Sequence, residues 1–129
     1  MSSVPHIRVV AAEIERAGEY LITQRRPEAA LPLLWEFPGG RVQEGESDTD
    51  ALRRTVRDRL DAGAQIGHRV LHVTHTYEAY ALDMVVYRCA LVGVPRAARV
   101  HAFRWVRPED FGLYTFPGAD QLTVDALLG

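Results

Sequence analysis

Two stretches near the N-terminus are rich in the apolar positions that form β-strands. Residues 7–13 (IRVVAAE) and 19–24 (EYLITQ) carry β-branched and other apolar residues, which favours strands. A polar turn that ends in Gly18 separates them, so the pattern predicts a β-hairpin. Residues 27–33 contain two prolines and are expected to form a loop. Pro38-Gly39-Gly40 is expected to interrupt regular secondary structure a second time.

Residues 47–62 carry the clearest helical pattern. Leu52, Val56 and Leu60 recur every four residues, which places them on one face of a helix. Ser47 stands where an N-cap would, and two aspartates follow it. A capping oxygen and negative charge both stabilise the start of a helix.

The second half of the chain predicts three further strands and a final helix. Apolar, β-branched and aromatic residues gather in segments between breakers, which is typical of strands. The expected elements are strands at 68–77, 80–92 and 102–106, a short helical turn at 108–111, and a helix at 119–128 that buries Leu122, Val124 and Leu127 or Leu128. Mixed strands flanked by two helices predict an α+β fold.

Composition narrows the class of protein. A chain of 129 residues with 47% hydrophobic and 25% charged residues is typical of one globular domain, here residues 1–129. No apolar run approaches the ~20 residues of a membrane span, and no export signal is recognisable, so a cytoplasmic location is expected. The net charge of −2 gives no reason to expect nucleic-acid binding. The single cysteine, Cys89, lies among apolar residues and is expected to be a buried thiol.

The stretch WEFPGGRVQEGESDTDALRRTVRDRLDA, residues 35–62, resembles the signature of the Nudix family, in particular its small MutT-like members. That signature is G-x5-E-x7-R-E-U-x-E-E-x-G-U, where U is a bulky aliphatic residue. Gly40, Glu46 and Arg54 stand at the required spacing, and Val56 takes the first U position. The resemblance implies a Nudix-type α/β/α sandwich with a mixed sheet, a loop-helix-loop motif and a C-terminal helix.

The second half of the signature departs from the family. Thr55, Asp58 and Arg59 stand where three helical glutamates are expected, and Asp61 with Ala62 replaces the closing Gly-U. Positions 55, 58 and 59 share one helix face and are expected to point toward the glycine loop. In family members this face binds Mg²⁺ or Mn²⁺ on a diphosphate and activates a water molecule.

The remaining acids define the predicted metal and catalytic residues. Segment 93–108 (GVPRAARVHAFRWVRP) contains no acid, although family members often place a carboxylate before the strand at 102–106. If the site is active with Mg²⁺ or Mn²⁺, the metal ligands are expected to be Gly40, Glu44, Glu46 and Asp58; otherwise no cofactor is needed. Glu46 and Asp58 are then the catalytic candidates, together with Arg54, which in family members braces the loop by an ion pair with Glu46.

Four residues are candidates for ligand binding. By resemblance, Asp120 in YTFPGADQLTVDALL reads the edge of a base, although it also suits the first turn of a helix. Arg25 in LITQRRP is expected to contact phosphate, with solvated surface charge as the alternative. Phe37 would line the base pocket. Arg59 could neutralise a phosphate without any metal.

Three functions remain open. The first is a Nudix domain that binds a nucleotide or related phosphate ester, with pyrophosphohydrolase activity lost or greatly weakened. The second is an active pyrophosphohydrolase that cleaves a nucleoside triphosphate or an oxidised purine nucleotide through a reduced metal shell. The third is a protein-interaction module with a protein partner and an empty pocket.

Overall fold

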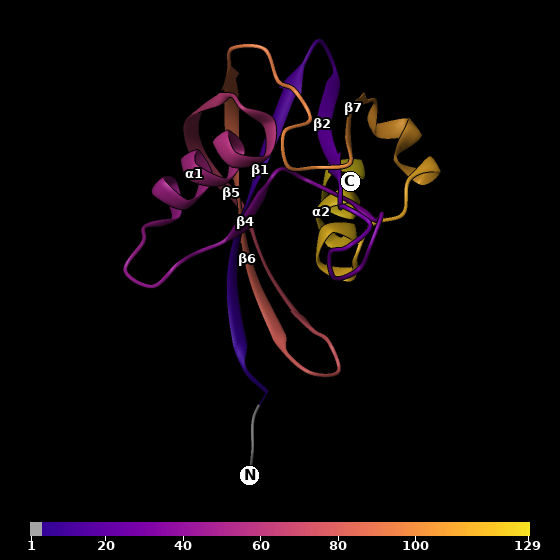
Figure 1. Cartoon of the computed structure of the whole chain (residues 1–129). Coiled ribbons are helices and arrows are strands. Elements are labelled where there is room, and N and C mark those ends of the chain that lie inside the picture. The colour runs from indigo at the N-terminus through magenta and orange to yellow at the C-terminus, as the bar shows by residue number, and fades with distance from the viewer. Residues whose placement is uncertain (1–3) are drawn as a thin grey trace.

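A computed structural model describes residues 4–129 as a mixed β-sheet with a helix on either side (Figure 1). The elements are, in chain order, β1 (His6–Arg16), β2 (Glu19–Gln24), β3 (Trp35–Glu36), β4 (Gly39–Arg41), α1 (Asp48–Leu60), β5 (Gly63–Thr76), β6 (Ala81–Val92), β7 (Ala102–Val106), the 3-10 helix η1 (Pro108–Leu113) and α2 (Gly118–Leu128). The α+β fold class expected from the sequence is confirmed.

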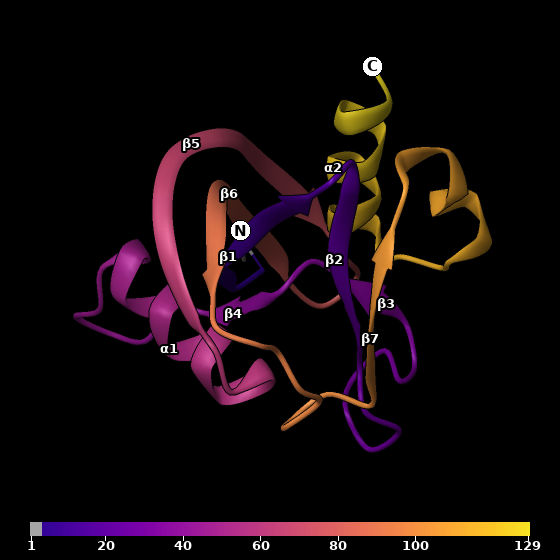
Figure 2. The same cartoon turned by 90° about the horizontal axis from the view of Figure 1, so that it is seen from above.

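Strand β1 is the centre of the sheet. The strand order is β3-β2-β1-β6-β5, with β4 paired to β1 and β7 paired to β2. The β1–β6 pair is parallel, whereas the β1–β2, β1–β4 and β5–β6 pairs are antiparallel. Viewed from above, α1 lies on one side of β1 and β6, and α2 lies beside β2 on the other (Figure 2).

Alternating side chains of β1 supply two separate cores. Val10, Ala12 and Ile14 pack on the α1 side, where they meet Leu52, Val56 and Leu60 of that helix. Ala11 points the other way, into a core with aromatic rings and the first turns of α2, namely Phe37, Phe111, Phe116, Ala119 and Val124. Successive residues of a strand face opposite sides, so β1 connects the two helices through the sheet.

The predicted helix at 47–62 is confirmed as α1. Ser47 caps it by accepting a hydrogen bond from the Asp50 amide, and Asp61 ends it in a left-handed conformation. None of the helices within residues 4–129 is long and apolar enough to cross a membrane. One domain over 1–129 stays a prediction.

Several boundaries differ from the sequence prediction. Strand β5 begins at Gly63 rather than residue 68, because its first residues continue the pairing with β6. The expected breaker Pro38-Gly39-Gly40 leads into β4, which pairs with β1. The prediction that Leu122 is buried is wrong, because Leu122 is 42% exposed and Thr123 is buried beside it. The burial of Val124 is confirmed.

Candidate functional site

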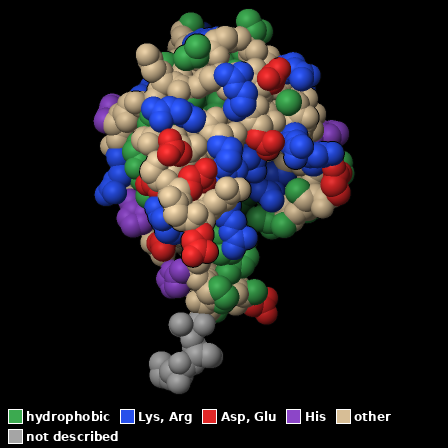
Figure 3. All heavy atoms as spheres, turned by 60° about the vertical axis from the view of Figure 1, so that its left-hand side comes forward, with side chains coloured by type: hydrophobic (Ala, Val, Ile, Leu, Met, Phe, Trp, Pro, Cys, Tyr) green, Lys and Arg blue, Asp and Glu red, His purple; other side chains and the backbone are tan. Residues whose placement is uncertain are grey.

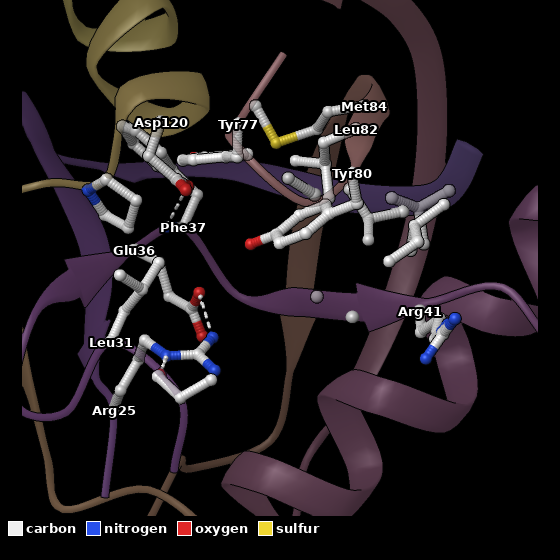
Figure 4. A pocket seen from close by; sticks show the side chains of 18 of the residues that line it. Arg25, Leu31, Glu36, Phe37, Arg41, Tyr77, Tyr80, Leu82, Met84 and Asp120 are labelled. Atoms are coloured by element: carbon white, nitrogen blue, oxygen red, sulfur yellow. Dashed lines mark hydrogen bonds and ion pairs between the residues drawn. The ribbon is translucent and has the colours of Figure 1, made fainter. Parts of the chain in front are cut away.

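A cavity of about 390 Å³ opens between β1, β4, the β5–β6 hairpin and the start of α2. Figure 4 shows its side chains, with Asp120 at one end, the Arg25–Glu36 pair below it and Arg41 on β4 farther along. Five of the residues predicted from the sequence line this cavity, namely Arg25, Phe37, Gly40, Arg59 and Asp120. We refer to the part around Asp120 as the acid end and to the part around Gly40 and Arg59 as the helix end.

Asp120 is a buried carboxyl group in the first turn of α2. Its Oδ1 accepts a hydrogen bond from the Phe37 amide at 3.3 Å (Figure 4). Burial, followed by the charge of Glu36, raises the pKa of Asp120 well above its usual range. A protonated carboxyl can both donate and accept hydrogen bonds, so this group suits recognition of a polar, planar edge.

Arg25 and Glu36 form an ion pair beside Asp120. The Arg25 Nη1 lies 3.0 Å from the Glu36 carboxylate, and its Nε donates to the Ala30 carbonyl at 2.6 Å (Figure 4). Arg25 therefore lines the cavity as predicted, but two of its three nitrogens already have protein acceptors. Its contact with phosphate stays a prediction.

Two tyrosines, which the sequence reasoning missed, cover the acid end. Tyr77 and Tyr80 flank the turn of the β5–β6 hairpin, with ring centroids 4.9 Å apart. The Tyr77 hydroxyl accepts a hydrogen bond from the Ala119 amide, and the Tyr80 hydroxyl points into the cavity (Figure 4). The YEAY turn was a visible signal for paired rings at a hairpin end, but the helix that this hairpin meets depends on tertiary packing.

The loop before α1 is braced as the resemblance implied. Arg54 Nε and Nη2 donate to the two oxygens of Glu46 at 2.7 and 2.8 Å, and Nη2 also donates to the Arg41 carbonyl. These bonds, with one from the Gln43 amide, lower the pKa of Glu46 to about 2. The bidentate pair thus fixes the loop on the helix, and catalytic roles for Glu46 and Arg54 stay predictions.

Positions 55, 58 and 59 were expected to point together toward the glycine loop, and the structure confirms this only in part. Thr55 and Arg59 do adjoin Gly40. Thr55 is buried, however, and its hydroxyl donates to the Ala51 carbonyl within the helix. Asp58 is exposed and lies 3.4 Å from Arg99, outside the cavity. Only Arg59 therefore presents a charge from this face to the cavity.

Gly40 makes room for the Arg59 guanidinium. A Cβ added to Gly40 would lie 3.0 and 3.1 Å from the two terminal nitrogens of Arg59, and 2.9 Å from the Thr55 methyl. These distances are tighter than ordinary van der Waals contacts, so a side chain at position 40 would displace the guanidinium. The absence of a side chain at Gly40 therefore leaves space for the Arg59 guanidinium beside β4.

The predicted metal ligands do not fit one ion. Over residues 4–129, no group of three or more His, Cys, Asp or Glu side chains is arranged to hold a metal. Glu46 is bound to Arg54, Asp58 faces Arg99, and Glu44 is exposed away from the cavity. A unit positive charge ~4 Å from a divalent ion costs about 8 kcal/mol at an effective dielectric constant of 20. The positive charge of Arg59 therefore disfavours binding of a divalent metal ion at the helix end.

The acid-free segment 93–108 is clasped to the end of α1. The amides of Ala98 and Arg99 both donate to the Arg59 carbonyl, at 3.0 and 3.1 Å. Arg96 pairs with Asp61 at 2.9 Å, beside the Arg99–Asp58 pair. The basic residues thus neutralise acids of the helix, and on this side of the molecule positive and negative side chains are interspersed (Figure 3).

Cys89 is buried as predicted and belongs to the core beneath α1. Burial raises the pKa of its thiol to about 11. The thiolate is the reactive form of cysteine, so this residue is chemically quiet near neutral pH.

Comparisons with known proteins identify the family of the chain. A family model for the NUDIX domain matches residues 9–126. The chain is 32% identical over 123 residues to a CTP pyrophosphohydrolase of Escherichia coli, covering 95% of this chain and 91% of the relative. It is 36% identical over 106 residues to a putative 8-oxo-dGTP diphosphatase 2 of Mycobacterium tuberculosis, covering 76% and 71% of the two chains.

Solved structures share the arrangement of strands and helices. The solution structure of the E. coli ORF135 protein superposes with a TM-score of 0.84 at 31% identity, covering 97% of this chain and 90% of the other. A MutT protein from Methanosarcina mazei gives a TM-score of 0.87 at 22% identity, with 98% and 95% covered. The chain therefore belongs to the Nudix family and is similar to its MutT-like members.

Proposed function

We propose that this Nudix domain binds a nucleotide or a related phosphate ester in the cavity and hydrolyses it weakly or not at all. The observation that carries the proposal is the contrast within one cavity between a buried carboxyl, Asp120, and a guanidinium, Arg59. A nucleotide has a polar planar base at one end and negative charge at the other. The two ends of the cavity match these two chemistries.

The acid end would take the base. Phe37 is 2% exposed and stacks on Phe116 with ring centroids 5.8 Å apart, which gives the cavity a rigid apolar wall. Asp120 supplies a hydrogen-bonding edge beside that wall, and Tyr80 faces it from the hairpin. Apolar walls with a few fixed polar groups are typical of sites for small planar ligands.

The helix end would take the phosphates. Arg59 is half-buried, and no aspartate or glutamate in the part of the chain that the structure describes forms an ion pair with it. A guanidinium is an effective partner for phosphate because its planar donors can bond two oxygens at once. The Arg59 charge is thus available to an anionic ligand.

The positions of the acids support the proposal of weak hydrolysis. Nudix hydrolases generally use divalent metals, which neutralise the diphosphate and activate water. In this chain Thr55 is buried and uncharged, Asp58 faces Arg99, and Arg59 carries the opposite charge to a glutamate. Few carboxylates therefore remain to hold a metal ion or to act as the general base.

An active pyrophosphohydrolase is the second candidate function. The braced loop with Gly40, Glu46 and Arg54 is intact, and two relatives carry the names CTP pyrophosphohydrolase and putative 8-oxo-dGTP diphosphatase 2. In that case CTP and oxidised guanine nucleotides are the substrates to test first.

One assay separates the two candidates. Pyrophosphate and phosphate release are measured from CTP, 8-oxo-dGTP, other nucleoside triphosphates and nucleotide sugars with Mg²⁺ or Mn²⁺, beside thermal melting with each compound. The Glu46→Gln variant is the test, and Glu109→Gln is its matched control because Glu109 is exposed, pairs with an arginine as Glu46 does and lies outside the cavity. Ligand-dependent stabilisation without turnover supports the binding protein, since a ligand that binds only the native state raises the melting temperature. Turnover that Glu46→Gln abolishes and Glu109→Gln preserves supports the hydrolase. Neither turnover nor stabilisation would refute both.

A further inference from the structure

At the helix end, Arg59 stands where the Nudix signature has a glutamate that binds a metal ion in family members. The Arg59 guanidinium and the Thr55 methyl both lie beside Gly40, in the space that a Cβ at that position would enter. The backbone of Arg59 is also held, because the amides of Ala98 and Arg99 both donate to the Arg59 carbonyl. The end of α1 that carries Arg59 is therefore anchored, and its guanidinium lines the cavity beside Gly40.

Nearby acids do not cancel this charge. Asp58, the adjacent acid, is drawn to Arg99 at 3.4 Å, and Glu46 is held by Arg54 through two bonds. Glu36 is 3.0 Å from Arg25 at the other end. Arg41 also lines the cavity on β4 and is exposed (Figure 4). The helix end thus combines two arginines that have no ion-pair partner among residues 4–129.

We propose that Arg59, assisted by Arg41, replaces the divalent ion, so that the protein binds the metal-free phosphate anion in preference to its Mg²⁺ complex. This inference rests on the proposed function and specifies the ionic form of the ligand. A free triphosphate brings its full negative charge to the two guanidinium groups, whereas a complexed one brings a divalent ion that they repel. Added Mg²⁺ should therefore weaken binding, contrary to the behaviour of a metal-dependent site.

The test is calorimetric titration of the intact protein with CTP and with inorganic pyrophosphate, in EDTA and in excess MgCl₂. Wild type is expected to bind at least one probe about tenfold more tightly in EDTA, which corresponds to about 1.4 kcal/mol. Arg59→Gln should lose about tenfold in affinity in EDTA and should no longer respond to Mg²⁺. Arg53→Gln is the matched control, because Arg53 lies on the same helix, pairs with Asp50 and is outside the cavity; it should behave like wild type.

The outcomes distinguish this inference from the proposed function. Tighter binding in MgCl₂, or an Arg59→Gln variant whose affinity equals that of Arg53→Gln in EDTA, would overturn the metal replacement while leaving nucleotide binding intact. If neither CTP nor pyrophosphate, nor the wider nucleotide panel, binds under either condition, the proposed function fails and the inference fails with it. Thermal melting of each variant without ligand establishes that the proteins are folded.

Discussion

The two ends of the cavity differ in the charge that their side chains present to a ligand. At the acid end, burial keeps Asp120 protonated to a higher pH than usual, and Arg25 is neutralised by Glu36. At the helix end, Arg59 keeps its charge without an acidic partner among the described residues. Arg59 stands beside Gly40 at a position where the Nudix signature has a glutamate, so the charge there is opposite to the one that the signature leads us to expect. One end of the cavity therefore offers hydrogen bonds, and the other offers a positive charge.

The largest expected effect comes from a substitution in the backbone that lines both ends of the cavity. Gly39 has a φ of +152°, and a Cβ there would collide with the Val10 carbonyl oxygen of β1. Gly39→Ala should lower the free energy of unfolding by about 3 kcal/mol, because a strained, buried backbone must shift. Chemical denaturation measures this. Gly45→Ala is a useful comparison, since Gly45 also has a positive φ but open space around it, and equal losses in the two variants would contradict the steric argument.

Restoring acids should bring the helix end closer to the family. Thr55→Glu combined with Arg59→Glu is expected to raise Mg²⁺-dependent hydrolysis about tenfold, because it replaces a repulsive charge by two potential ligands. Steady-state pyrophosphate release measures the gain. A folded double variant whose rate stays at the wild-type level would show that the charge of Arg59 is not what limits hydrolysis.

The acid end can be probed through pH. Because the pKa of Asp120 is raised in the folded state, the native protein holds a proton that the unfolded chain loses above its ordinary pKa of about 3.9. Stability due to Asp120 is therefore present below that pH and is lost as pH rises toward the raised pKa. Asp120→Asn should gain stability relative to wild type across this window.

Urea denaturation over a series of pH values measures that gain. Asp125→Asn, an exposed position on the same helix, should show no such trend. Parallel pH profiles for wild type and Asp120→Asn would mean that the buried carboxyl titrates normally.

The smallest expected effect concerns the loop brace. The pKa of Glu46 is lowered to about 2, so its stabilising contribution is present above an unfolded pKa of about 4.3 and is lost as pH falls through 2. Glu46→Gln should be modestly less stable than wild type at pH 7, since the ion pair is near the surface. The difference should vanish in strong acid, as measured by thermal melting, and its persistence at pH 2 would point to packing rather than charge.

Much of the fold was predictable because local signals agreed with the tertiary structure. Leu52, Val56 and Leu60 are spaced for one buried helix face, and all three are fully buried. Leu122 failed for a tertiary reason: α2 turns Thr123 and Val124 toward the sheet, and only the neighbouring strands determine that rotation.

The candidate site was predictable only in part. The Glu46–Arg54 pair was anticipated from the family resemblance. In contrast, the ion pair between Asp58 and Arg99 joins residues that are 41 positions apart in the chain. The Tyr77–Tyr80 pair lines the cavity because the β5–β6 hairpin contacts α2. Such long-range contacts leave no periodic signal in the chain.

The clasp between segment 93–108 and α1 has a consequence for the opening motions of the site. The amides of Ala98 and Arg99 are bonded to the Arg59 carbonyl although their segment is exposed. Hydrogen exchange at the Arg99 amide requires its bond to the Arg59 carbonyl to break, whereas the Ala98 amide also donates to the Arg96 carbonyl. Slow exchange at Arg99, made slower by a bound phosphate anion, would therefore report on how firmly segment 93–108 is held to the end of α1.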